Sequence, residues 1–570
     1  MVAPPRSSVP RDVATGTDGL DEDSGPTRRR SVGSRLLRLL LAALACIALV
    51  VLAYYVALHD VVVNSDGATL ALEGYSLDHG NFLLNHWNLS LDSFWTSDAA
   101  INAAIVAFLG VQPTTSVLGP AIAAAAVTVI GAVLAAQGRR GAPAVAGAVT
   151  VLAVLAFPTF GMAGFWLRGG QHVVTALAAL IAFLAVRRGR FGVGWIVAVI
   201  FLAAGTLGDL QEVVFGCVPL VIAGLLAAVR ARRWGALAAP VSAGLGGGVL
   251  AAVVREIALA IGSYGIASAN ARAKPHQMVV NVTKTPGFFA QLMGVHNTAF
   301  GTGGVPDWLQ HLHGIIVVVL GLAALLAALR LVVGVVSGPG RADGRPRWWR
   351  REPEQALVDD ALLAACFAPI GVFAVLTTSD LNTQFVRYLM PTIIFSAVLG
   401  ARIVARWFAF SRFRSLKAGA TVAGLACVAL FAAATGYQLD QPVPTTPATQ
   451  LVSLLREHGL TRGLGDYWSS SITTVWSHGH QTVRPVIAGP KGKIIPYTRE
   501  SDNQWYRGKF QFLVTNRTDP FGTVNMATAK ATWGQPAHIY RSGYYNVLVW
   551  SKPLSVTPTK ARGALQPGHI

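Results

Sequence analysis

The stretch His59–Asp98, HDVVVNSDGATLALEGYSLDHGNFLLNHWNLSLDSFWTSD, lies between two apolar segments that are each long enough to cross a bilayer. It contains six carboxylates and three histidines but no Lys or Arg, in a chain whose formal net charge is +19. A segment beside a membrane span that lacks basic residues lies outside the cytoplasm under the positive-inside rule. We therefore predict a long first outer loop at 59–113. Its carboxylates and imidazoles suit general acid/base chemistry or metal binding.

The composition of the whole chain indicates a polytopic membrane protein. Hydrophobic residues make up 53% of the chain and charged residues 13%, against roughly 25% charged in soluble globular proteins. Nucleic acid is excluded as an explanation of the positive charge, because the basic residues form no stripe with interleaved aromatics. The four cysteines fall inside apolar segments, which favours small buried side chains over a disulfide framework or a zinc site.

Windows of about 20 apolar residues predict eleven transmembrane helices. They lie near 36–58, 115–137, 142–160, 172–187, 191–208, 213–230, 236–260, 312–334, 358–377, 387–406 and 418–437. Basic residues concentrate in the loops that this count places inside, including Arg139-Arg140, Arg187-Arg188, the cluster Arg341–Arg351 and the segment Arg402–Lys417. The short outer connections are acidic or nearly neutral. The segment Thr96–Val111 is apolar but short and polar-flanked, so we expect a helix lying along the outer interface.

These patterns predict four regions and a multi-pass location in the plasma membrane. Residues 1–34 form a disordered cytoplasmic tail, and 35–437 form the transmembrane domain. Residues 438–552 form a small extracytoplasmic α/β domain, because short β-type runs alternate there with helical segments. The β-type runs are 482–487, 493–497, 510–515 and 544–550. Residues 553–570 form a loose tail.

Four outer segments carry candidate functional residues. Asp66 follows the first span, and Arg168 and His172 lie in the turn between the third and fourth spans. The other two segments are Asp209–Glu212 and the entry to the tenth span, which reads Arg387-Tyr388-Leu-Met-Pro391. An arginine at the outer end of a span runs against the positive-inside trend, and ionisable groups at such depth are more often functional than decorative.

An acidic residue just after the first span, a long outer loop with helical character, eleven spans and Arg-Tyr-x-x-Pro entering a late span together resemble the GT-C superfamily of membrane glycosyltransferases. The pattern is most similar to bacterial relatives of the protein O-mannosyltransferase and aminoarabinose transferase group. Two features depart from the family pattern. Asp66-Gly67 stands where the family often has an acidic pair, and Leu84-Asn85-His86-Trp87 stands where it has a Lys-Pro-Pro-like stretch.

The resemblance implies transfer of a hexosyl or pentosyl group from a polyprenyl-phosphate donor to a glycan, lipid or protein acceptor of the cell envelope. It implies Asp66 as general base and Arg387 with Tyr388 as the phosphate site. Weaker candidates for substrate contacts are Arg168, His172, Asp209, Glu212 and His86, and a divalent metal could bind among them. The alternatives are a transporter or lipid-linked sugar flippase, which would lack transferase activity, and a non-catalytic scaffold.

The predicted topology can be tested with reporters that are active on one side of the membrane only. A reporter fused after Gly459 should read extracytoplasmic, and one fused near Gly344 should read cytoplasmic, because the basic loops are retained inside. Both reporters on the same side would rule out the eleven-span arrangement.

Overall fold

The computed structural model describes residues 32–60, 64–266, 272–293, 306–336, 353–377, 383–410, 414–489, 492–517 and 524–557. The predicted tail before residue 32, the cluster Arg341–Arg351, Asp380 and the last thirteen residues fall outside these ranges. The chain divides into two compact units, Met1–Ala45 and Cys46–Ile570. The first unit contributes the opening half of helix α1 (Val32–Asp60), and all other described elements belong to the second.

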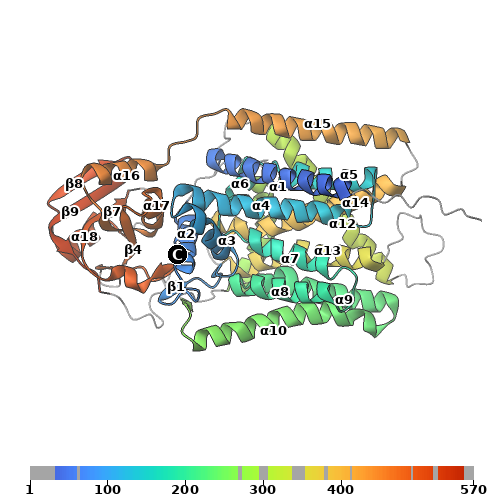
Figure 1. Cartoon of the computed structure of the whole chain (residues 1–570), viewed down its shortest axis with the longest axis horizontal. Coiled ribbons are helices and arrows are strands. Elements are labelled where there is room, and N and C mark those ends of the chain that lie inside the picture. Colours follow the sequence, from blue (N-terminus) through green and yellow to red (C-terminus); the bar gives the residue numbers. More distant parts are fainter. Residues whose placement is uncertain are drawn as a thin grey trace, which may run out of the picture. The chain divides into compact units, whose positions relative to one another are not determined.

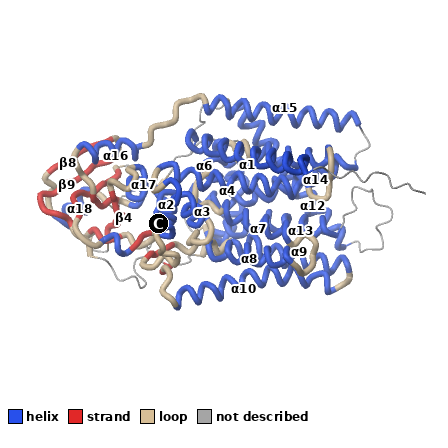
Figure 2. Tube along the Cα trace, in the orientation of Figure 1, coloured by secondary structure: helices blue, strands red, loops and turns tan. Residues whose placement is uncertain are grey.

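Each of the eleven predicted spans is helical, as Figures 1 and 2 show. The helices are α1, α4 (Pro113–Ala136), α5 (Ala142–Leu155), α7 (Val173–Ala185), α8 (Val193–Gly208), α9 (Val218–Ala231), α10 (Ala238–Ala260), α12 (Asp307–Val336), α13 (Pro353–Leu376), α14 (Met390–Phe410) and α15 (Arg414–Leu439). Among the described residues, eight helices are long and apolar enough to cross a membrane. Helices α5, α7 and α8 are shorter, with 14, 13 and 16 residues, so the count of eleven crossings stays a prediction.

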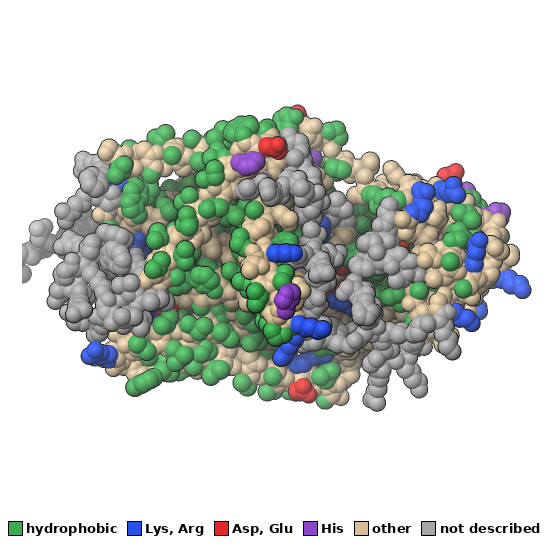
Figure 3. All heavy atoms as spheres, turned by 180° about the vertical axis from the view of Figure 1, so that it is seen from behind, with side chains coloured by type: hydrophobic (Ala, Val, Ile, Leu, Met, Phe, Trp, Pro, Cys, Tyr) green, Lys and Arg blue, Asp and Glu red, His purple; other side chains and the backbone are tan. Residues whose placement is uncertain are grey.

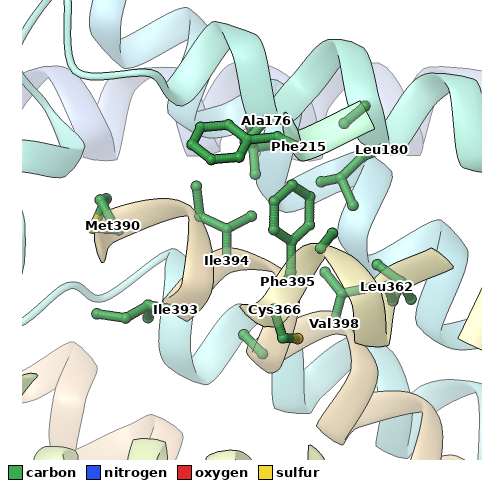
Figure 4. Packing of buried hydrophobic residues seen from close by; sticks show 14 of the residues in the cluster. Ala176, Leu180, Phe215, Leu362, Cys366, Met390, Ile393, Ile394, Phe395 and Val398 are labelled. Atoms are coloured by element: carbon green, nitrogen blue, oxygen red, sulfur yellow. The ribbon is translucent and has the colours of Figure 1, made fainter. Parts of the chain in front are cut away.

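The second unit has an apolar exterior along these helices and a tightly packed interior. Figure 3 shows hydrophobic side chains covering the helical part of one face, and large side chains of α10 such as Leu245 and Val249 are 58% and 62% exposed. In the interior, Phe215, Ile394 and Phe395 are fully buried (Figure 4). An exposed apolar surface of this kind matches a lipid environment, so the chain is a polytopic membrane protein.

Buried ion pairs tie helices α13 and α14 together at their predicted inner ends. Arg402 is completely buried, and its Nε donates to Asp359 Oδ1 at 2.7 Å. Arg406 also donates to Asp359, while Arg230 of α9 pairs with Asp360. Arg402 and Arg406 therefore lie within α14 and not in a connecting loop. A buried charge is tolerated only when it is paired and hydrogen-bonded, and this pairing fixes how α14 packs on α13.

The long segment after the first span is mostly folded into two helices. Helix α2 (Ser65–Asp78) packs on α3 (Asp98–Leu109), so the helical character predicted for Thr96–Val111 is confirmed. A Cβ atom at Gly74 would lie 2.7 Å from the backbone of α3. Only glycine allows the two helices to approach this closely.

The C-terminal domain contains a six-stranded mixed sheet in the order β5-β4-β3-β7-β9-β8. Its strands are β3 (Arg462–Gly465), β4 (Thr482–Ala488), β5 (Ile494–Pro496), β7 (Phe510–Asn516), β8 (His538–Ser542) and β9 (Tyr545–Leu554). Helices α16 (Pro447–Glu457), α17 (Tyr467–Trp476) and α18 (Met526–Trp533) accompany the sheet. The predicted α/β composition is confirmed, and strands β4, β5, β7 and β9 fall where the sequence placed them.

Two strands of the six-stranded sheet and one helix beside it escaped the sequence analysis, as did the two-residue strand β6 (Ser501–Asp502). The central strand β3 reads Arg-Gly-Leu-Gly and lacks the branched and aromatic residues typical of strands. Its glycines have a packing role, since a Cβ atom at Gly463 would lie 2.2 Å from the ring of Phe512. The second unpredicted strand of this sheet is β8, and the unpredicted helix is α18.

Candidate functional site

Asp66 sits in the first turn of α2, where the chain re-enters a helix after the first span. Asn64 caps this helix by accepting a hydrogen bond from the backbone N–H of Gly67 at 3.4 Å. A carboxylate in the first turn is stabilised by the positive end of the helix dipole. The helix start therefore presents the Asp66 side chain, which is partly buried, as an anionic group.

The C-terminal domain packs directly over this helix start. Thr69 of α2 donates to Ser471 of α17 at 2.9 Å, in a buried contact between residues 402 positions apart. Side chains of both helices share one hydrophobic cluster, which includes Leu72 and Ile472. Strand β1 (Trp87–Leu89) also pairs with β6 (Ser501–Asp502), and it pairs in parallel with β2 (Gly265–Ile266) on its other side.

Docking of α17 brings a tyrosine and a second carboxylate to Asp66. The hydroxyl of Tyr467, the first residue of α17, donates to Asp66 Oδ1 at 2.6 Å. The same hydroxyl lies within hydrogen-bonding distance of Glu500 Oε2. Burial, followed by the negative charges of Asp66 and Glu500, raises the pKa of Tyr467 well above its ordinary value. Tyr467 therefore stays protonated and serves as a donor.

Two arginines face the same carboxylate from the membrane helices. Arg168, in the turn before α7, and Arg387, in the short helix η5 (Thr383–Leu389), both interact electrostatically with Asp66. Pro391 follows at the start of α14, a position where proline favours helix initiation. The structure thus brings Asp66, Arg168 and Arg387 into one electrostatic cluster, as the sequence analysis had grouped them.

A second cluster, which contains His172, Asp209 and Asp92, lies next to the Arg387 segment. His172 Nδ1 is 2.7 Å from Asp209 Oδ2, and both side chains are completely buried. Asp209 also accepts from Thr175 at 2.5 Å and from the backbone N–H of Gln211 at 3.0 Å. Burial raises the pKa of Asp209, but these hydrogen bonds and His172 outweigh it and hold the pKa below its ordinary value. The ring of Tyr388 lies 5.3 Å from that of His172, which connects this cluster to the Arg387 segment.

The second cluster has the donor set of a divalent-cation site. One ligand atom from each of Asp92, His172 and Asp209 lies within 4.8 Å of the others. Two carboxylates and an imidazole suit a divalent cation such as Zn²⁺ or Mn²⁺. Burial and the neighbouring Asp209 raise the pKa of Asp92 to about 6, as expected where two carboxylates lie close together in a buried site. A cation bound there would remove that repulsion.

The loop geometry around this cluster is strained. His172 has φ 63° and Phe94 has φ 51°, both in the left-handed region that non-glycine residues rarely adopt. Gly170, at φ 70°, donates its N–H to Asp98 Oδ1 at 3.1 Å. Strain of this kind is found most often at functional sites.

Of the two remaining predicted site residues, Glu212 lies beside Asp209 and interacts with it electrostatically, whereas His86 lies apart from both clusters. Glu212 is completely buried, but its side chain packs between Gly205 and Gly216 inside the helical bundle. His86 is exposed, and its carbonyl accepts from the N–H of Asn503 in the C-terminal domain. Among the described residues, neither side chain forms a hydrogen bond or an ion pair with Asp66, so a shared role with Asp66 stays a prediction.

The sequence analysis missed three groups that lie at the site. Asp92 and Glu500 were not singled out, and the aromatic ring of Tyr467 by itself suggests only that it could stack on a sugar. Glu500 has a non-glycine left-handed φ of 53°. Its position depends on pairing between segments more than 400 residues apart, such as Asn88 with Ser501, so local sequence holds no signal for it.

The fold and the site together define a polytopic membrane protein with a charged, partly buried site where its C-terminal domain packs on helix α2. No protein-family model matches the sequence, and no curated protein matches it. The crystal structure of ArnT from Cupriavidus metallidurans in the apo state is similar, with a TM-score of 0.38 and 12% identity over 91% of this chain and 98% of that chain. A likeness at this TM-score does not assign a function to the chain.

The buried carboxyl group of Asp98 generates a prediction about stability. Burial raises the pKa of Asp98 to about 6, although the N–H of Gly170 opposes this. A raised carboxyl pKa stabilises the folded state at low pH, and that contribution is lost as pH rises through about 6. Asp98→Asn should therefore raise the unfolding temperature of the solubilised protein at pH ~7.5 and change it little at pH ~4, with an effect on the order of 3 kcal/mol.

Asp78→Asn, near the far end of α2, is the matched control and should show no such pH dependence. An Asp98→Asn protein that is less stable than the parent at the higher pH would contradict the assignment of a buried, readily protonated carboxyl.

Proposed function

We propose that this protein is a membrane glycosyltransferase of the GT-C superfamily. It would move a sugar from a polyprenyl-phosphate donor to an acceptor of the cell envelope outside the cytoplasm. The observation that carries the proposal is the grouping of Asp66 with two arginines, Arg168 and Arg387, at the first turn of α2. A carboxylate beside two guanidinium groups is the arrangement that a general base next to a cationic phosphate site would require.

Asp66 is suited to the acceptor side of such a reaction. An acceptor hydroxyl is a weak nucleophile near neutral pH, and a carboxylate within hydrogen-bonding reach can take its proton as the oxygen attacks the anomeric carbon. One Asp66 oxygen accepts from Tyr467 and the other from Asn64 at 3.3 Å. These two bonds orient the carboxylate before substrate arrives, which is what an efficient base requires.

The arginines are suited to the donor side. As the bond between the anomeric carbon and the phosphate oxygen breaks, its electron pair goes to the phosphate, and preplaced cationic donors stabilise that charge. A guanidinium group can bind a phosphate through two parallel hydrogen bonds. The Arg387 guanidinium carbon lies 5.3 Å from the ring centroid of Tyr388, so the phenol is placed beside the guanidinium that would hold the phosphate.

A lipid-linked donor also accounts for the location of the site. Asp66 follows α1, and Arg387 precedes α14, which is one of the candidate membrane spans. The polyprenyl chain could remain in the bilayer while its phosphosugar headgroup reaches the arginines. The C-terminal domain, which contacts Asp66 through Tyr467, would then face the acceptor.

The donor site is tested with substitutions of Arg387. Arg387→Lys keeps the charge but loses the two-pronged geometry, so affinity for a polyprenyl-phosphate sugar should fall measurably. Arg387→Ala should lower it further, in a protein that still inserts and folds. Donor binding to the purified protein is the measurement, and two variants that bind and turn over the donor like the parent would show that Arg387 has a structural role.

The general base is tested with Asp66→Asn, which is nearly isosteric and can still hydrogen-bond. Transfer should drop by about 10²–10⁴-fold, the usual contribution of a general base, while donor binding changes little. The measurement is the rate of sugar transfer from polyprenyl-phosphate sugars by the purified enzyme.

Asp78→Asn is the control, because it removes the same charge from the other end of the same helix. Equal losses in both variants would indicate an effect of charge or folding instead of a base. Full activity of Asp66→Asn would refute the assignment of the base. Binding or movement of the lipid-linked sugar without transfer would favour a transporter or flippase.

A further inference from the structure

The hydroxyl of Tyr467 has two carboxylate partners but only one hydrogen to donate. It bonds Asp66 Oδ1 at 2.6 Å and also contacts Glu500 Oε2. A hydroxyl that donates to one carboxylate can only accept from the other. Both contacts are therefore hydrogen bonds once the chain holds one additional proton, as it would after Asp66 has taken the proton of the acceptor. Asp66, Tyr467 and Glu500 form a hydrogen-bonded chain in which a proton has a defined route.

The Glu500 end of the chain reaches solvent. The Glu500 side chain is 20% exposed and lies 3.5 Å from the guanidinium of Arg499, which is 44% exposed. Asp66, at the other end, faces Arg168 and Arg387 from the membrane helices. Glu500 is therefore exposed enough to exchange a proton with water.

The backbone holds Glu500 in this place at some cost. Its φ of 53° lies in the left-handed region, which is unfavourable for a non-glycine residue and persists only where the surroundings enforce it. The next two residues, Ser501 and Asp502, form strand β6 and pair with β1 beside helix α2. The same contact that docks the C-terminal domain therefore sets the orientation of Glu500.

We propose that Glu500 is the second functional carboxylate of the site and that Tyr467 couples it to Asp66 as a proton outlet. This inference rests on the proposed transferase function. During transfer the acceptor O–H bond breaks, its hydrogen passes to Asp66, and the acceptor oxygen bonds to the anomeric carbon as the electron pair of the broken bond leaves on the phosphate. Asp66 then gives a proton to the oxygen of Tyr467, Tyr467 gives its own hydrogen to Glu500, and Glu500 releases a proton to water.

Tyr467 and Glu500 are positioning residues in this scheme, and their substitutions should have opposite effects on pH dependence. Tyr467→Phe removes a hydrogen bond to the Asp66 carboxylate, so the acidic limb of the pH–rate profile should move to higher pH. Glu500→Gln removes a neighbouring negative charge, so the limb should move to lower pH. Each shift should be on the order of one pH unit, as is usual for a lost hydrogen bond or a lost like charge.

Other charged or titratable groups near this chain are kept unchanged in both variants. They are Arg168, Arg387, Arg499, Tyr497 and Glu73. Because these groups are common to the parent and both variants, a difference in the direction of the shift reports on Tyr467 and Glu500 themselves.

The experiment measures kcat and KM against pH for the parent and both variants, with polyprenyl-phosphate mannose and polyprenyl-phosphate arabinose as hexose and pentose probes. In both variants the loss of rate should appear as a lower kcat. KM for the donor should change less than about twofold, because neither side chain is placed at the phosphate site. Glu500→Asp, which keeps the carboxylate, should recover part of the rate. Tyr540→Phe on β8 and Glu457→Gln on α16 are controls away from the site, and both should behave like the parent.

If the acidic limb of the pH–rate profile is unchanged in both variants, or moves in the same direction in both, the proposed coupling is wrong. Failure of the proposed function gives a different result, namely no transfer by the parent with either probe. In that case the pH dependence of thermal unfolding tests the coupling without any donor. Opposite displacements for Tyr467→Phe and Glu500→Gln would support it, and identical curves would overturn it.

Discussion

The packing of helix α17 on helix α2 is the contact on which the candidate site depends. It joins the C-terminal domain to the first turn that follows the membrane, through the Thr69–Ser471 hydrogen bond and a shared apolar cluster. Without it, Asp66 would keep its helix cap and its arginines but lose Tyr467 and Glu500. One interface therefore stabilises the domain arrangement and completes the site.

The bilayer imposes a second constraint, which limits where ionisable groups can lie along the membrane helices. A charged side chain inside a low-dielectric helix bundle must be paired with an opposite charge or lie near the end of a helix. At the predicted inner end, Arg402 and Arg406 share Asp359 in a fully buried pairing that fastens α14 to α13. At the other end of α14, Arg387 has no carboxylate at hydrogen-bonding distance among the described residues and interacts with Asp66 and Asp92 only over longer range. Arg387, in the short helix η5 that precedes α14, is therefore placed to bind an anion.

The two acidic clusters differ in how their charge is balanced. Asp209 accepts bonds from His172, Thr175 and a backbone N–H, and its pKa is held low. Asp92, beside it, has a pKa raised to about 6 by burial and by Asp209. Pairs of carboxyl groups whose pKa values are shifted in opposite directions are a common feature of functional sites. In the Asp66–Tyr467–Glu500 chain the two carboxylates are separated by a neutral phenol, which can hydrogen-bond to both.

The sequence by itself determined the membrane class, the eleven helical segments and the α/β character of the C-terminal domain, because hydrophobic length and periodicity are local properties. It also singled out Asp66, Arg168, His172, Asp209 and Arg387, since ionisable residues next to apolar spans stand out in composition. It could not find strand β3, whose Arg-Gly-Leu-Gly sequence is explained only by the ring of Phe512 above Gly463. Nor could it connect Asp66 with Tyr467 and Glu500, which lie 401 and 434 positions further along the chain. Only tertiary packing brings those three side chains together, because contacts between distant segments leave no periodic pattern in the sequence.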